Sequence, residues 1–236
     1  MGEVSTSEAG DGVRGGSQDV RKRTSRGLSR LDEVISGWSH GAGAGLSLAG
    51  LVLLILLAAH KGSAWLIASV AVYGAALVLL YSASSIYHLL NDGRAKNLFE
   101  HLDHGAIFLA IAGTYTPFTL VTMHGPVGDA IAAAVWLFAL GGIAFKLLSP
   151  QRFARGTAFL YLAMGWLILF GLGTLLHRLA PGGLALLIGG GLVYSAGVGF
   201  YLWERLPFNH SIWHGFVLTG SALHFCAVVF YVVPGA

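Results

Sequence analysis

Charge is what this sequence has least of. Asp, Glu, Lys and Arg make up 11% of its 236 residues, whereas soluble domains typically carry about 25%. Such a chain has little charge to present to water, so an ordinary soluble domain is excluded. Cysteine is scarce too. The single cysteine, Cys226, lies inside an apolar run, so no intrachain disulfide can form.

Long polar loops are absent as well. Hydrophobic residues make up 55% of the chain, and its 34 glycines would let membrane helices approach one another closely. Seven apolar stretches are each long enough to cross roughly 30 Å of hydrocarbon, which takes about 20 residues. The sequence therefore predicts an all-α polytopic membrane protein, a seven-transmembrane-helix bundle. The stretches lie near residues 41–60, 64–90, 101–122, 127–148, 157–177, 183–203 and 211–233.

The first 30 residues differ from the rest. They contain Gly, Ser, Asp, Glu and the run RKRTSR, with almost no apolar residue. Such a segment cannot bury a core, so we expect a disordered basic tail over 1–30 and a transmembrane domain over 31–236. We expect no secretory signal peptide, because the first apolar run begins only near residue 41.

The positive charges are distributed unevenly between the two sides that seven spans define. Only Lys61 and Arg178 fall on one side, and the other side has twelve of the 14 Lys and Arg. The positive-inside rule then predicts a cytoplasmic N-terminus and an external C-terminus. The twelve are Arg14, Arg21, Lys22, Arg23, Arg26, Arg30, Arg94, Lys96, Lys146, Arg152, Arg155 and Arg205.

Three clusters of polar residues lie at the predicted ends of spans, where ionisable groups indicate function because the bilayer makes them costly. One closes the second span and the other two open the third and the seventh. Span direction predicts that all three lie at the cytoplasmic end, so residues distant in sequence share one membrane depth. The clusters contain Ser84 and His88, Asp103 and His104, and His210 and His214.

The spacing of His210 and His214 favours a metal site. Four residues of helix make about one turn, so both rings lie on one face and can bind one ion. A third nitrogen from His88 would complete the usual three protein ligands of a catalytic zinc. Asp103 would then serve as a general base or would hydrogen-bond to a ligand, and Ser84, one turn before His88, would assist either group.

Each of these histidines alone is more often a hydrated residue at the membrane interface than a ligand. Only the joint pattern at one depth favours metal binding. We expect His224, ten residues beyond His214, to bond a neighbouring helix, and we expect a structural role for His104. The remaining histidines considered, which we assign to loops or span edges, are His40, His60, His124 and His177.

Several segments in order resemble the hemolysin III family, a bacterial branch of the progestin and adipoQ receptor group that includes the adiponectin receptors. They are DEVISGWSHGAG, SSIYH, LDHGAIFLAIAGTYTPF, GLVYSAGVGFY and HSIWHGFVLTGSALHF. The wider superfamily, which includes alkaline ceramidases, is proposed to consist of intramembrane metal-dependent hydrolases. The resemblance implies zinc (Zn2+) on His88, His210 and His214, with Ser84 and Asp103 beside it.

Three functions remain open. The first is an intramembrane zinc hydrolase that cleaves an amide or ester of a lipid-like substrate, with Asp103 transferring the proton and Ser84 assisting. The second is a receptor or signalling protein with a structural zinc, and the third is a hemolysin-like cytolysin. We expect a multi-pass protein of the cell (inner, plasma) membrane, with lipid as its surroundings, a metal site near the cytoplasmic face, and no nucleic-acid partner.

Overall fold

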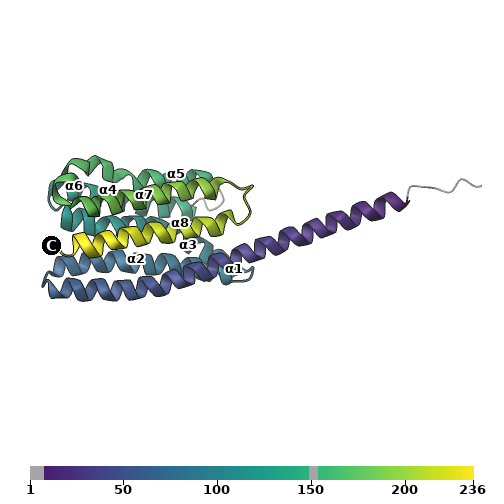
Figure 1. The fold of residues 1–236 in the computed structure, drawn as a ribbon, viewed down its shortest axis with the longest axis horizontal. Helices are drawn as coiled ribbons and strands as arrows, with labels where there is room; N and C mark the ends of the chain where they lie inside the picture. The colour runs from purple at the N-terminus through teal and green to yellow at the C-terminus, as the bar shows by residue number, and fades with distance from the viewer. Residues whose placement is uncertain (1–7, 149–153) are drawn as a thin grey trace, which may run out of the picture.

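The structure is a computed structural model that describes residues 8–148 and 154–236, all of them helix, turn or short connection. Seven helical segments are long and apolar enough to cross a membrane, which confirms the predicted seven spans and the all-α fold (Figure 1). Backbone polar groups find no water in hydrocarbon, so a spanning segment must bond its own N–H and C=O groups as a helix. The spans are Gly27–His60, Ala64–Leu89, Arg94–Thr122, Pro126–Leu148, Gly156–Arg178, Pro181–Leu202 and Asn209–Val232.

Eleven helical elements make up these spans in the described residues, because three spans change helix type along their length. They are α1 (Glu8–His60), α2 (Ala64–Leu89), α3 (Arg94–Pro117), η1 (Phe118–Thr122), α4 (Pro126–Leu148), α5 (Ala154–Gly165), η2 (Leu167–Gly171), α6 (Leu172–Arg178), α7 (Pro181–Leu202), α8 (Asn209–Ala227) and η3 (Val228–Val232).

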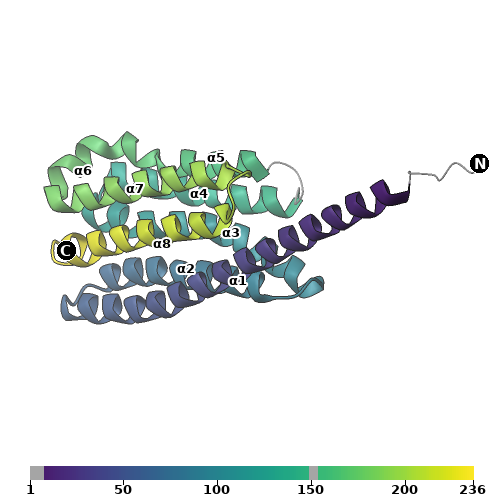
Figure 2. The same ribbon diagram turned by 45° about the vertical axis from the view of Figure 1, so that its right-hand side comes forward.

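The first helix is longer than the first apolar stretch. It begins at Glu8 and runs through residues 30 and 31 without a break, so the predicted boundary between tail and domain lies within a helix. The N-terminal part of α1 extends well beyond the bundle, and the C-terminus lies at the opposite end (Figure 2). An odd number of spans requires the two termini to lie at opposite ends of the bundle. Which end faces the cytoplasm stays a prediction.

Small residues let α1 approach α2 closely near one end of the bundle. A Cβ placed on Gly37 would lie 2.6 Å from Cγ of Leu89 and 3.4 Å from Cβ of His88. A distance under 3 Å is shorter than real Cβ contacts, so this position accepts no larger side chain without movement. Glycine at 37 thus brings the polar residues of α1 against the end of α2 where His88 lies.

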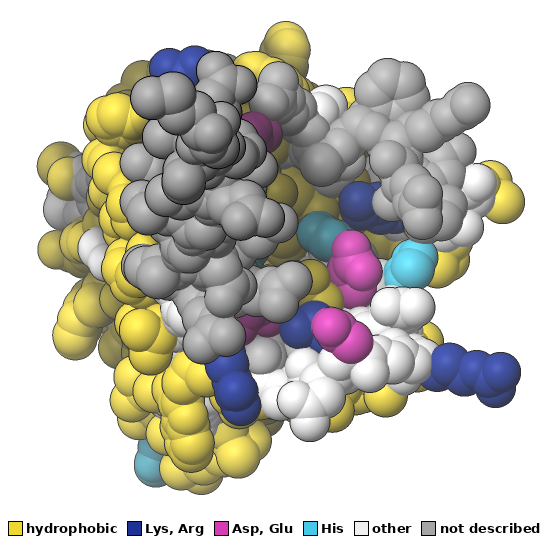
Figure 3. All heavy atoms as spheres, turned by 90° about the vertical axis from the view of Figure 1, so that its right-hand side faces the viewer, with side chains coloured by type: hydrophobic (Ala, Val, Ile, Leu, Met, Phe, Trp, Pro, Cys, Tyr) yellow, Lys and Arg dark blue, Asp and Glu magenta, His cyan; other side chains and the backbone are white. Residues whose placement is uncertain are grey.

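The outer surface of the bundle is apolar, as lipid contact requires. Side chains such as Leu46, Leu137 and Phe170 are 73%, 70% and 85% exposed, respectively. Viewed from the end where α1 projects, hydrophobic side chains cover the flanks, while Lys, Arg, Asp, Glu and His gather on the end itself (Figure 3). The polar residues of interest therefore lie at one end of an otherwise lipid-facing molecule.

Candidate metal centre

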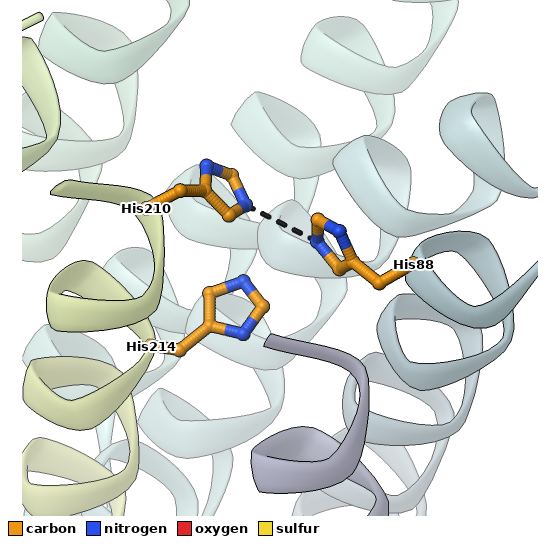
Figure 4. Close-up of side chains that lie close together, drawn as sticks. All are labelled: His88, His210 and His214. Carbon is orange, nitrogen blue, oxygen red and sulfur yellow. Dashed lines mark hydrogen bonds between the residues drawn. The ribbon is translucent and has the colours of Figure 1, made fainter. Parts of the chain in front are cut away.

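Three histidines from two helices meet at this end of the bundle. His88 comes from the last turn of α2, and His210 and His214 come from the first turns of α8. One ring nitrogen from each can be chosen so that all three lie within 4.8 Å of one another. The rings face a common centre (Figure 4). The convergence expected from the sequence is thus present in the structure.

The separation between two of the nitrogens fits a tetrahedral metal ion, and all three lie within 4.8 Å of one another. Nε2 of His210 lies 3.1 Å from Nε2 of His88. Two nitrogens held 2.0–2.1 Å from a tetrahedral zinc are about 3.3 Å apart. His88 and His214 are buried and His210 is half-buried, so few waters compete for their nitrogens. Three imidazoles are a donor set that zinc accepts, and the residues present therefore fit the ion.

Acceptors on α1 set the orientation of two of these rings. Nδ1 of His88 lies 3.3 Å from Oε2 of Glu33, and Nδ1 of His214 lies 3.2 Å from the carbonyl oxygen of Ser36. A carboxylate and a carbonyl only accept hydrogen bonds, so the proton of each ring is on Nδ1. Nε2 of each ring is then unprotonated and accepts at the common centre, where Nε2 of His88 meets Nε2 of His210; this tautomer is typical of metal-bound histidine.

A second acidic residue of α1 holds the beginning of α8. Oδ1 of Asp32 accepts a hydrogen bond from the backbone N–H of Ser211 at 3.0 Å and another from the Ser211 hydroxyl. The first N–H groups of a helix have no partner inside the helix, so Asp32 acts as a cap from outside α8. Ser211 lies between His210 and Ile212, so the cap fixes the turn that bears two of the three histidines.

Lys96 completes the polar contacts of Glu33. Its Nζ donates to Oε2 of Glu33 at 3.0 Å and to the carbonyl oxygen of Leu90 at 3.3 Å. The side chain of Glu33 is 37% exposed, so the ion pair with Lys96 is partly screened by water. The pair nevertheless joins α1 to the connection between α2 and α3, directly after His88.

His40 lies inside α1 and is not the hydrated span-edge residue that the sequence predicted. It is 3% exposed, and its ring stacks on that of His214 with centroids 3.5 Å apart and planes 8° from parallel. Neither ring nitrogen has a hydrogen-bond partner among the described residues. The prediction was wrong because α1 continues past the first apolar stretch. The helix carries His40 to a buried position beside the three-histidine cluster.

Asp103 and Ser84 lie beside the cluster, as the sequence predicted. Both are buried, at 7% and 1% exposure, and both line a cavity that His210 and His214 also line. Ser84 Oγ has no hydrogen-bond partner among the described residues. A buried hydroxyl and carboxyl of this kind can bind a group that enters the cavity.

The cavity has a volume of about 160 Å³ and extends from these polar residues into the bundle. Aliphatic and aromatic side chains form most of its wall. A smaller cavity of about 60 Å³ adjoins it and shares Tyr115, Trp166 and His224 with it. Nε2 of His224 bonds the carbonyl oxygen of Leu187 in α7 at 3.0 Å, which confirms the role expected for this histidine. His104 also lines the larger cavity.

Proline 117 marks a change of helix type in the third span. The chain is α-helical up to Pro117 and π-helical from Phe118 to Thr122. Proline has no N–H to donate, so the regular ladder is interrupted there. The hydroxyl of Thr116 donates to the carbonyl oxygen of Ala112 at 2.9 Å. Tyr115, one residue before Thr116, lies where the two cavities meet.

Seven membrane-spanning helices with a histidine cluster and a cavity at one end define the class of this protein: a heptahelical membrane protein with a candidate metal centre. The profile of the family described as Haemolysin-III related matches residues 28–225. The chain belongs to this family. The match includes Glu33, His88, Asp103, His210 and His214, so every residue of the candidate centre lies inside the family region.

Individual relatives agree with this membership. The chain is 45% identical to Hemolysin-3 of Bacillus cereus over 205 residues, which covers 87% of this chain and 94% of the relative. It is 32% identical over 182 residues to a heptahelical transmembrane protein, ADIPOR2, of Oryza sativa subsp. japonica, covering 66% of this chain and 77% of the relative. It is 29% identical over 178 residues to the human monocyte to macrophage differentiation factor, which covers 72% of this chain and 70% of the relative. The predicted resemblance is confirmed.

Proposed function

We propose that this protein is an intramembrane zinc-dependent hydrolase that cleaves an amide or ester bond of a lipid-like substrate. The observation that carries the proposal is the position of a buried carboxyl, Asp103, on the wall of the cavity that His210 and His214 also line. Ligands for a metal and a group able to transfer a proton thus border one cavity. Such a combination is typical of metal-assisted hydrolysis.

His88, His210 and His214 would hold the ion through Nε2. A zinc ion bound there supplies a Lewis acid that polarises a carbonyl oxygen and lowers the pKa of water. Asp103 accepts a proton from the attacking water and returns it to the leaving nitrogen or oxygen as the amide or ester bond breaks. Ser84, whose hydroxyl has no hydrogen-bond partner among the described residues, donates a hydrogen bond to the oxygen on which negative charge develops.

The cavity favours an amphiphilic substrate. Its charged residues and two of the candidate ligands lie at one end of the bundle, and most of the remaining wall is apolar, with side chains of α3, α5 and α7 such as Ile111, Leu162 and Val198. An acyl chain in the deep part would place the adjoining carbonyl near Asp103. Asp103, Ser84 and His214 are buried, which limits their contact with water and strengthens the electrostatic interactions there.

The experiment that tests the proposal compares Asp103→Asn with His214→Ala. Zinc content is measured by elemental analysis of purified protein, and turnover is measured with a panel of fluorogenic acyl amides and esters. We expect Asp103→Asn to keep about one zinc per chain while turnover falls 10²–10⁴-fold, the usual contribution of a general base. His214→Ala should lose both. Zinc loss in Asp103→Asn, or turnover that survives it, would contradict the assigned role.

A signalling protein with a structural zinc is the second candidate. It is favoured by the contacts of Asp32, Glu33 and Ser36, which tie α1 to α2 and α8 around the histidines. Metal binding would then stabilise the bundle, and Asp103→Asn would leave both stability and function intact. Unfolding of wild type and Asp103→Asn, each with and without chelator, measures how much the metal stabilises the bundle. The turnover assay then separates the two candidates, because Asp103→Asn loses turnover only if the protein is a hydrolase.

The name Hemolysin-3 given to the Bacillus cereus relative suggests a third candidate, lysis of cells. We expect this chain to reside in the cell membrane instead, with its N-terminus in the cytoplasm and the histidines near the cytoplasmic face, because of the charge bias between its loops. Purified protein added to erythrocytes should release no more haemoglobin than His214→Ala protein does. Reporter fusions at each terminus test the orientation.

A further inference from the structure

Lys146 lies in the last turn of α4 and is 7% exposed, although lysine is almost never buried without a partner. It lines the same cavity as Asp103, Ser84 and His214. The sequence assigned this residue to the positively charged side of the membrane and gave it no other role. In the structure its side chain contributes to the wall of the candidate site.

No protein group neutralises this lysine in the part of the chain that the structure describes. No hydrogen bond or salt bridge there involves Nζ of Lys146, and Asp103, the acidic residue on the cavity wall, is not within 4.0 Å of it. His104, another basic residue, lines the same cavity. An ammonium that borders a membrane cavity without a counter-charge indicates a functional site, because its burial is costly.

The charges of the cavity favour an anion. Among the described wall residues, Lys146 contributes one positive charge and Asp103 contributes one negative charge, while the candidate ligands His210 and His214 are neutral when they bind metal. A divalent ion on these ligands would make this end of the cavity positive overall. Most of the remaining wall is apolar, with residues such as Ile107, Ile111 and Val198, so the space joins a cationic end to a mostly apolar interior.

We propose that Lys146 binds the anionic headgroup of a single-chain amphiphile whose alkyl chain occupies the apolar part of the cavity. The headgroup chemistry is a carboxylate or a phosphate, each of which accepts hydrogen bonds from an ammonium. From Asp103 to Tyr115, α3 lines the cavity over twelve residues, about 18 Å at the helical rise. This length accommodates a long alkyl chain. The proposal goes beyond hydrolysis, because binding requires neither turnover nor Asp103.

Two tryptophans on the cavity wall, Trp166 and Trp213, supply the measurement. Chain-brominated palmitate, hexadecyl phosphate and hexadecanol quench tryptophan fluorescence on contact, so titration of each into detergent-purified full-length protein gives an affinity. We expect the wild type to bind at least one of the two anions about tenfold more tightly than the alcohol. A preference for palmitate identifies a carboxylate site, and one for hexadecyl phosphate identifies a phosphate site.

The variants are Lys146→Gln, Lys146→Met and Lys146→Arg, with Lys61→Gln as the matched control. Lys61 lies at the other end of the bundle, where its Nζ donates to the carbonyl oxygen of Pro234. We expect the anion-to-alcohol ratio to fall to about one in Lys146→Gln and Lys146→Met and to persist in Lys146→Arg and Lys61→Gln. Because the ratio is measured within each variant, partial unfolding weakens the binding of the anion and of the alcohol alike. It therefore does not imitate the loss of the anion preference.

Equal binding of anion and alcohol by the wild type would overturn the proposal, as would an undiminished ratio in both uncharged variants. Zinc content and turnover of the wild type separate this inference from the proposed hydrolysis. If the wild type shows neither zinc nor turnover while the ratio still depends on Lys146, the anion site stands and the hydrolase does not. If turnover is present and the ratio is independent of Lys146, the hydrolase stands and Lys146 merely extends to the aqueous surface.

Discussion

Oε2 of Glu33 lies 3.3 Å from Nδ1 of His88, a residue 55 positions further along the chain. This contact fixes the ring so that Nε2 faces His210 and His214. Glu33 also accepts a hydrogen bond from Lys96, so the acid that orients the histidine is itself held in place. The candidate centre therefore depends on α1 as much as on the two helices that bear its histidines.

Glu33→Gln should weaken zinc binding about 10–100-fold, the usual effect of removing a hydrogen-bond partner of a metal-bound histidine. The amide keeps the size of the side chain but loses the charge that makes the imidazole a stronger ligand. Zinc affinity is measured by competition with a chromophoric chelator. Asp129→Asn is the matched control, since Asp129 is an exposed carboxylate near the beginning of α4 and should have no effect. Equal affinity in Glu33→Gln and wild type would show that the contact does not support the metal.

His40→Phe should retain zinc within about twofold. The ring of His40 is parallel to that of His214, with centroids 3.5 Å apart, so its nitrogens lie beside the common centre rather than facing it. Phenylalanine preserves the stacked ring, whereas His40→Ala leaves a void against His214 and should weaken zinc binding. Elemental analysis of the two variants checks this. If His40→Phe loses the metal as completely as His214→Ala does, His40 is a fourth ligand.

Hydropathy alone was enough to predict the seven spans, because a hydrocarbon core requires long apolar helices and short connections between them. Span direction then brought His88, Asp103, His210 and His214 to one end, and the structure has them there. The membrane constrains every residue of a span, so its effect can be seen directly in the sequence.

The residues that surround the histidines were harder to predict, because they lie on a polar part of α1 that has no apolar run. Asp32, Glu33, Ser36 and His40 precede the first predicted span, and their partners lie on other helices. One signal was available. Glu33, Ser36 and His40 are spaced three and four residues apart, so they share one helix face if the helix extends inward from the membrane. Lys146 gave no such signal, since its burial depends on packing.

Acidification should release the metal. Imidazole has an ordinary pKa near 6.5, and its protonated form cannot bind zinc. Below that pH, protons compete with zinc for the three imidazoles, so zinc affinity falls as pH falls. The fall reaches up to three powers of ten per pH unit where all three imidazoles must lose a proton before they bind zinc. Stabilisation by zinc is then present above about pH 6.5 and lost below it. Zinc content after dialysis at pH 7.5 and at pH 5 checks this, with His214→Ala as the control that holds no metal at either pH. Full retention at pH 5 would contradict an imidazole site.

Asp32→Ala should destabilise the bundle by about 1–2 kcal/mol, because the N–H of Ser211 in the first turn of α8 then loses its acceptor. The loss falls on the turn that bears His210, so zinc affinity should decrease as well. Asp32→Asn keeps an oxygen that accepts from the Ser211 N–H and should remain within a few tenths of a kcal/mol of wild type. Unfolding by titration with SDS in the presence of chelator measures the structural effect without the metal. Equal destabilisation by Asn and Ala would mean that the charge of Asp32, and not its hydrogen bond to α8, supports this end of the bundle.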